Sequence, residues 1–171
     1  AGQTSTAQIT IRIEGVNDAP NAIDDKETLD LDETSEITNF DDSSKYVKAN
    51  DTDVDHLDNI SLNSVRTGKT NESGSSVTVG SAFSSQYGSI TFFSDGGYNY
   101  TANSGLRDTL SPGEKLYEYF TYTITDSKGL TASAQLTIEI FGSTNVLEET
   151  EEEQQDEEIF NPFLDNKKSL Y

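Results

Sequence analysis

The chain reads YEYFTYTIT over Tyr117–Thr125 and ASAQLTIEI over Ala132–Ile140. In both stretches apolar residues alternate with polar ones, which predicts two strands that each bury one face. The run Asp126-Ser127-Lys128-Gly129 between them predicts a tight turn. Together these three segments predict an antiparallel hairpin with the apolar side chains of both strands on the same face.

The same period of two recurs along the chain in short runs separated by Gly, Asn, Asp and Ser, and helix signals are missing. Further strands are predicted at Ile60–Val65, Ser76–Val79, Gly88–Phe93 and Tyr98–Thr101, with weaker candidates at Thr28–Leu31 and Tyr46–Lys48. Ser94-Asp95-Gly96-Gly97 predicts a second hairpin turn. About seven or eight short strands in one chain predict an all-β fold, an antiparallel β-sandwich.

Apolar alternation also predicts which residues close the core: Phe120, Tyr122, Ile124, Ala134, Leu136, Ile138, Ile140, Ile90 and Phe92. A set of tyrosines follows the same strands, at positions 98, 100, 117, 119 and 122. They could form a platform for stacking sugars, but we favour cross-strand packing with the phenol tips in water.

An internal repeat sets the domain organisation. AQITIRIEGVND (Ala7–Asp18) and AQLTIEIFGSTN (Ala134–Asn145) are identical at six of twelve positions, with an offset of 127 residues. Both predict the closing strand of a repeated unit. We therefore expect residues 1–18 to be the last strand and linker of a preceding repeat, residues 19–145 to be one complete repeat, and residues 146–171 to be a tail.

The predicted tail has two parts. Leu147–Glu158 holds eight carboxylates and no basic residue, so like charges repel with no apolar face to bury, and we expect disorder. Ile159–Tyr171 carries apolar residues around Asn161-Pro162. This segment could dock on a partner, serve as a secretion signal or begin a further segment.

Composition excludes several classes of protein. The 171 residues include 31 acidic and 11 basic side chains, a formal net charge of -20, and no Cys or Met. Nucleic acid and anionic lipid recruit Lys and Arg, so we expect neither as a partner. No run is long and apolar enough for membrane insertion. The lack of Met suggests a piece of a longer protein. With a single histidine, His56, and no Cys, no catalytic arrangement is apparent, and we expect no enzyme.

The densest polar cluster predicts a metal site. Asp51, Asp53, Asp55 and Asp58 lie close together in one predicted loop, and carboxylate oxygens suit Ca²⁺. An EF-hand is excluded because His56 and Leu62 occupy the sixth and twelfth positions of the loop, where Gly and Glu are needed. His56 is either exposed or a weak extra ligand. The alternative is an Asp-rich loop in water with no ion.

Further acids could join this loop. They are Asn17-Asp18 in the linker, Asp24 and Asp25 just after Pro20, and Asp126 in the turn before the last strand.

Several motifs, in this order along the chain, resemble the VCBS repeats of large bacterial surface proteins. They are Tyr87–Thr91, Ser94–Asn103, Leu110–Glu114, Tyr119–Asp126, Gly129–Ala132 and the closing LTIEIFG. The linker Gly15–Pro20 and the run Ala49–Asp55 are similar to those of the related cadherin-like bacterial Ig-like repeats.

This resemblance implies an Ig-like, cadherin-like sandwich in a protein that is secreted or attached to the bacterial cell surface and acts in adhesion or biofilm. It also implies Ca²⁺ at the junctions between repeats. By position, Asp18, Asp24 and Asp25 correspond to the linker acids, Asp51, Asp53 and Asp55 to the loop acids, and Asp126 to the turn acid. Asp58 is a candidate on spacing alone.

The second copy of the repeat ends Gly142-Ser143-Thr144-Asn145-Val146, without the acid and proline of Gly15–Pro20. We therefore expect the array of repeats to stop here.

Three functions are compatible with these observations. The leading one is a calcium-stiffened structural spacer whose partners are the neighbouring repeats of the same chain. The second is a module that recognises a surface glycan or a protein ligand. The third is a subunit of a surface layer or extracellular filament, joined through the tail or a free edge strand.

Overall fold

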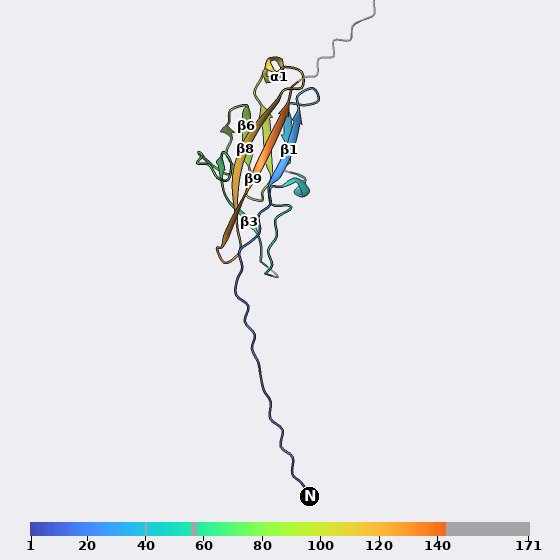
Figure 1. The fold of residues 1–171 in the computed structure, drawn as a ribbon, viewed down its shortest axis with the longest axis vertical. Coiled ribbons are helices and arrows are strands. Elements are labelled where there is room, and N and C mark those ends of the chain that lie inside the picture. Colours follow the sequence, from blue (N-terminus) through green and yellow to red (C-terminus); the bar gives the residue numbers. More distant parts are fainter. Residues whose placement is uncertain (40, 56–57, 143–171) are drawn as a thin grey trace, which may run out of the picture.

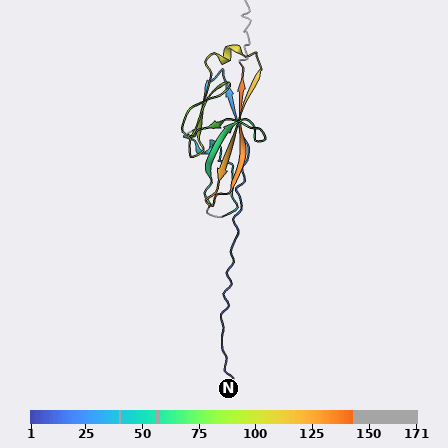
Figure 2. The same ribbon diagram turned by 90° about the vertical axis from the view of Figure 1, so that its left-hand side faces the viewer.

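The computed structural model describes residues 1–39, 41–55 and 58–142 as a two-layered sandwich with an extended N-terminal segment (Figures 1 and 2). One sheet has the order β1 (Asp25–Asp30), β9 (Thr131–Phe141), β8 (Lys115–Thr125), β3 (Ser61–Thr67), β4 (Ser76–Val77). The other has the order β2 (Glu36–Thr38), β7 (Tyr98–Ala102), β6 (Gly88–Phe92), β5 (Phe83–Ser84). The predicted all-β sandwich is confirmed.

The central hairpin is the one predicted from YEYFTYTIT and ASAQLTIEI. Strands β8 and β9 are 11 residues long each and pair antiparallel along their whole length, from Lys115 opposite Phe141 to Thr125 opposite Thr131. The predicted turn at Ser94–Gly97 also joins two paired strands, β6 and β7. Its Gly96 has a φ of 98°, a conformation that residues with a Cβ rarely adopt.

The predicted core residues are buried, and each has a relative exposure between 0 and 2%. The tyrosines divide into two groups. Tyr98, Tyr100 and Tyr122 lie in the core with their rings fully covered, so the expectation that their phenol tips reach water is wrong. Tyr117 and Tyr119 lie on the other face of β8, where their rings stack with centroids 6.4 Å apart. Because successive side chains of a strand point to alternate faces, residues 117 and 119 lie on the face of β8 that points away from the core, and residues 118 and 120 lie on the other face.

Strand direction is the first feature that the alternation did not predict. β1 pairs parallel to β9, with Asp25 opposite Leu136 and Asp30 opposite Phe141, while the other strand pairs are antiparallel. A strand alternates in the same way whichever way it runs, so the sequence pattern does not distinguish these cases.

Short elements differ from the prediction as well. Tyr46–Lys48 is a turn and not a strand; it follows the 3-10 helix η1 (Ser43–Lys45), and Val47 still buries its side chain completely. A one-turn helix, α1 (Leu106–Thr109), also contradicts the expectation of no helix. Strands β2 and β5 were not predicted. Elements of two to four residues are too short to show a period.

Different segments of the chain gather at the two ends of the sandwich. The linker from the N-terminal segment, the loop before β3 and the β8–β9 turn lie at one end, the N-terminal pole, and α1 and the end of β9 lie at the other (Figure 1). Residues 1–16 form no strand, and Ile9, Ile11 and Ile13 are 79–90% exposed.

The division into residues 1–18, 19–145 and 146–171 stays a prediction. His56 and the predicted tail lie outside the described residues. Within the described part of the chain, no helix has the length and apolar character needed to cross a membrane.

A buried carboxylate links three adjacent strands of the larger sheet through ion pairs. Glu139 on β9 is 2% exposed and pairs with Lys26 of β1 and with Lys115 of β8, the latter at 2.6 Å. The Lys115 ammonium also lies 4.7 Å from the centre of the Phe141 ring. Hydrogen bonds from Lys115 and Lys26 lower the pKa of Glu139 below its usual 4.5. One acid therefore holds three adjacent strands together.

The Glu139→Gln variant should be less stable than the wild type at pH 7, and the difference should shrink as the pH falls below 4.5. The reason is that a lowered folded-state pKa contributes stability above the unfolded pKa and loses it once the carboxylate is protonated. Urea unfolding at a series of pH values measures this difference. Glu36→Gln on the exposed surface of β2 is the control, and a pH-independent difference for Glu139→Gln would contradict the ion-pair explanation.

Candidate metal centre

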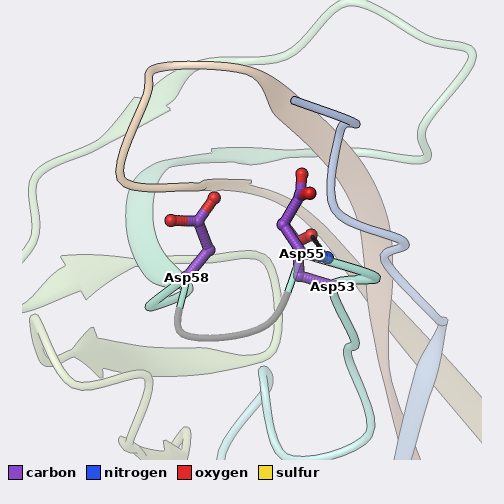
Figure 3. Close-up of side chains that lie close together, drawn as sticks. All are labelled: Asp53, Asp55 and Asp58. Carbon is purple, nitrogen blue, oxygen red and sulfur yellow. Dashed lines mark hydrogen bonds between the residues drawn. The ribbon is translucent and has the colours of Figure 1, made fainter. Parts of the chain in front are cut away.

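Three of the predicted loop acids converge at the N-terminal pole. Carboxylate oxygens of Asp53, Asp55 and Asp58 all lie within 4.8 Å of one another. The side chain of Asp58 faces those of Asp53 and Asp55 across the loop (Figure 3). The loop curls because the Asp55 amide donates to Asp53 Oδ1 at 2.8 Å and the Asp58 amide donates to the Asp55 carbonyl at 3.2 Å.

The oxygens of this three-carboxylate group fit a hard cation. Asp53 Oδ2 is buried and accepts no hydrogen bond. Asp58 Oδ2 is also buried without one, and its contact is an ion pair with Lys128 at 3.7 Å. Burying a carboxylate oxygen without a donor is costly, and a divalent ion with oxygen ligands, such as Ca²⁺, removes that cost.

The β8–β9 turn closes one side of the site. Asp126 is 5% exposed, and its Oδ1 accepts hydrogen bonds from the amides of Lys128 at 2.8 Å and Leu130 at 2.9 Å. Burial opposes the ionisation of Asp126, but hydrogen bonds from Asn17 and from the backbone of this turn outweigh burial and lower its pKa. Asp126 is therefore a fixed negative charge. Ser127 of the same turn donates to Asp58 Oδ1.

The linker docks on these same acids. The Asn17 amide donates to Asp126 Oδ2 at 2.7 Å, and the Asp18 backbone N–H donates to Asp55 Oδ2 at 2.7 Å. Asp18 reaches the group through its backbone, while its side chain is exposed. A little further on, Asn21 and Thr52 form an isolated antiparallel bridge. The residues that gather negative charge are thus also the ones that hold the linker.

The other three predicted site residues lie in a second polar region, where β1 begins. Asp51 Oδ1 accepts hydrogen bonds from the Ile23 backbone amide at 2.8 Å and from the Tyr122 hydroxyl at 3.2 Å. Asp24 Oδ1 accepts a hydrogen bond from the Gln135 backbone amide at 2.8 Å. The structure therefore does not bring Asp24, Asp25 and Asp51 into the three-carboxylate group, although Asp51 is close to Asp53 in the sequence.

In this second region ionisation is disfavoured. Burial raises the pKa of Asp25 to about 7, and repulsion from Asp51 and Asp24 adds to the rise, while Tyr122 and Asn50 oppose it. Burial also raises the pKa of Asp51, against hydrogen bonds from Ile23 and Tyr122. Asp25 is therefore partly protonated near neutral pH, and a protonated carboxyl group can both donate and accept hydrogen bonds. Such a group fits a hydrogen-bonded network that ties the start of β1 to the core.

Sequence reasoning missed two residues that the geometry brings to the site, Ser127 and Lys128. It named Asn17 only together with Asp18 as a linker site, without a predicted contact. Ser127 and Lys128 lie in the predicted turn, so position along the chain was the available signal. The contacts of these three residues depend on the fold, since Asn17 and Asp126 are 109 residues apart.

The alternative platform of tyrosines lies elsewhere. Tyr117 and Tyr119 line a cavity of about 350 Å³ between β5 and β8, together with Phe83, Gln86 and the buried Glu118. None of the acids predicted as metal ligands lines it. Recognition of a glycan or a protein at these rings stays a prediction.

Comparison with known families agrees with this architecture. The model of a family described as bacterial cadherin-like domain matches residues 17–142, which include the linker, the loop acids and the β8–β9 turn. A search of curated proteins finds no matching sequence.

The Tyr122→Phe variant should destabilise the chain by about 1–3 kcal/mol, the usual cost of leaving buried hydrogen-bonding groups unpaired. The Tyr122 hydroxyl is within 2.8 Å of the Ile23 carbonyl as well as near Asp51, so its loss also frees the linker end at Ile23. Urea unfolding and hydrogen exchange of the Ile23 amide measure both effects. Tyr119→Phe on the outer face is the control, and unchanged exchange at Ile23 would contradict the prediction.

Proposed function

The chain belongs to the bacterial cadherin-like domain family, and from this premise we propose that it is a structural spacer repeat of an adhesin-type protein. In this proposal, Ca²⁺ at the N-terminal pole braces the linker against the sandwich. The observation that carries the proposal is a shared set of residues. Asp55 belongs to the three-carboxylate group and accepts the Asp18 backbone amide, and Asp126, in the adjoining turn, accepts the Asn17 side chain.

In the proposed mechanism, Asp53, Asp55 and Asp58 would hold the ion, and its charge would offset their mutual repulsion. The chain's own residues do the mechanical work. Asp126 fixes the shape of the turn with one oxygen and the position of Asn17 with the other. The Asp18 amide then sets the direction in which the linker leaves the pole. No substrate or chemical step is part of this proposal.

The size of the effect follows from the class of site. Extracellular calcium modules bind with dissociation constants near 10⁻⁴ to 10⁻³ M. Occupancy at ten times the dissociation constant stabilises a fold by only about 1.4 kcal/mol. The main consequence should therefore be on the orientation of the linker, with a smaller effect on unfolding.

The proposed partner is the preceding repeat of the same parent chain. Ile9, Ile11 and Ile13 correspond by position to Leu136, Ile138 and Ile140 of β9, which are buried. A stripe of three isoleucines at 79–90% exposure is what a closing strand shows without the rest of its own sandwich. With its net charge of -20 the chain is suited neither to nucleic acid nor to membrane insertion. We place the parent protein outside the bacterial cell, secreted or on its surface, as an adhesin would be.

Titration calorimetry of the 171-residue chain with Ca²⁺ should give binding in the submillimolar to millimolar range, and Asp53→Asn should weaken it at least tenfold. Removing one charged ligand from the three-carboxylate group lowers both the charge and the coordination that the ion receives. Asp108→Asn in α1, an exposed acid at the opposite pole, is the matched control. Absence of any Ca²⁺ binding by the wild type would refute the calcium proposal.

The repeat offset allows a test of stiffening. Gly142 corresponds to Gly15, so a tandem that joins residues 19–142 directly to residues 16–142 preserves the junction. Small-angle X-ray scattering should show a larger and better defined maximum dimension with Ca²⁺ than with a chelator, because a braced linker restricts the angle between repeats. Asp53→Asn in the second repeat should remove the difference. Identical scattering curves in both conditions would rule out a stiffening role.

A further inference from the structure

One basic side chain reaches into the three-carboxylate group. The Lys128 ammonium lies 3.7 Å from Asp58 Oδ2 and 3.3 Å from Asn17 Oδ1. Its own backbone amide donates to Asp126 Oδ1 at 2.8 Å, so the turn fixes where the side chain starts. Lys128 thereby contacts the loop, the turn and the linker at once.

The surroundings of this ammonium differ from those of an ordinary surface lysine. Within residues 1–39, 41–55 and 58–142, no other Lys or Arg makes an ion pair with the three carboxylates. The Asp58 side chain is only 9% exposed, whereas that of Lys128 is 61% exposed. The carboxylate is therefore held in place by Ser127 and the loop, and the lysine is free to leave.

We propose that Lys128 is an internal competitor of the divalent cation at this pole, and thereby sets its affinity; this rests on the proposed function. With no ion bound, the ammonium offsets part of the negative charge and keeps Asn17 docked. When the ion binds, like charges repel, and the long flexible stem of the lysine carries the ammonium out into water. The hydrogen bonds to Asp126 and Asp55 dock the linker, and in this proposal Lys128 strengthens that docking weakly and the ion strengthens it firmly.

The consequence of this competition is a lower affinity for Ca²⁺, so that the site fills only at a high calcium concentration. Each binding event must break the Lys128 contacts with Asp58 and Asn17, so the measured affinity is lower than the carboxylates alone would give. Because an ion pair of this exposure is weak, the expected penalty is roughly two- to fivefold in the dissociation constant. Lys128 is an affinity-setting residue that does not itself ligate the ion.

The test compares Lys128→Gln with the wild type and with Lys69→Gln, which removes the same charge from the β3–β4 connection, where Lys69 lies over the Tyr119 ring. By calorimetry, Lys128→Gln should bind Ca²⁺ roughly two- to fivefold more tightly, and Lys69→Gln should not. In chelator, ¹⁵N relaxation should show faster motion of the Asn17 and Asp18 amides in Lys128→Gln. At saturating Ca²⁺ the wild type and Lys128→Gln should show the same relaxation of these two amides.

The two readouts separate the possible failures. If the wild type binds Ca²⁺ and Lys128→Gln binds it no more tightly, the competitor role is wrong while the proposed function stands. Equal tightening in Lys69→Gln would also overturn it, because the effect would then be that of net charge alone. If neither chain binds Ca²⁺, the proposed function fails and the competitor role fails with it.

Discussion

The Asp126 carboxylate is the group on which the N-terminal pole depends. One of its oxygens accepts two backbone amides of the β8–β9 turn, and the other accepts the side chain of Asn17. The first contact fixes the shape of the hairpin that forms the centre of the larger sheet. The second fastens the incoming chain to that hairpin. Because one side chain does both, the direction of the linker is coupled to the most extensively paired part of the fold.

Around this group the sequence concentrates negative charge where the chain enters the sandwich. Asp53, Asp55 and Asp58 come within 4.8 Å of one another, with Asp126 buried in the neighbouring turn and Lys128 as the nearby cation. Such crowding is unfavourable without a counter-charge. In the proposed function, the balance between the lysine and a divalent ion adjusts how firmly the linker is held, which is the property that a spacer in a tandem array requires.

The other structural acids have a different role. Glu139 is buried between two lysines and joins β1, β9 and β8, and Asp25 and Asp51 join the start of β1 to Tyr122. The chain therefore carries several buried or half-buried carboxylates that differ in their partners. Glu139, with a lysine at each oxygen, is structural, whereas Asp53 and Asp58 each keep an unpaired Oδ2 within the three-carboxylate group and fit a cation. Asp25 and Asp51 also keep an unpaired Oδ2, but they lie outside that group. An acid count from the sequence does not separate these cases, because the distinction lies in which carboxylates converge and in the donors around each oxygen.

Alternation and the two turn sequences were enough to predict the β8–β9 hairpin, the β6–β7 hairpin and the core residues, because strand period and turn composition are local properties of the chain. The loop acids were identified from another local feature, their clustering in one short run. Tertiary structure decided the parallel pairing of β1 with β9, the burial of the Tyr98, Tyr100 and Tyr122 phenols, and the separation of Asp51 from Asp53, Asp55 and Asp58. It also decided that Asn17 and Lys128 belong at the site. These features depend on contacts between residues as many as 111 positions apart, and no local pattern encodes such contacts.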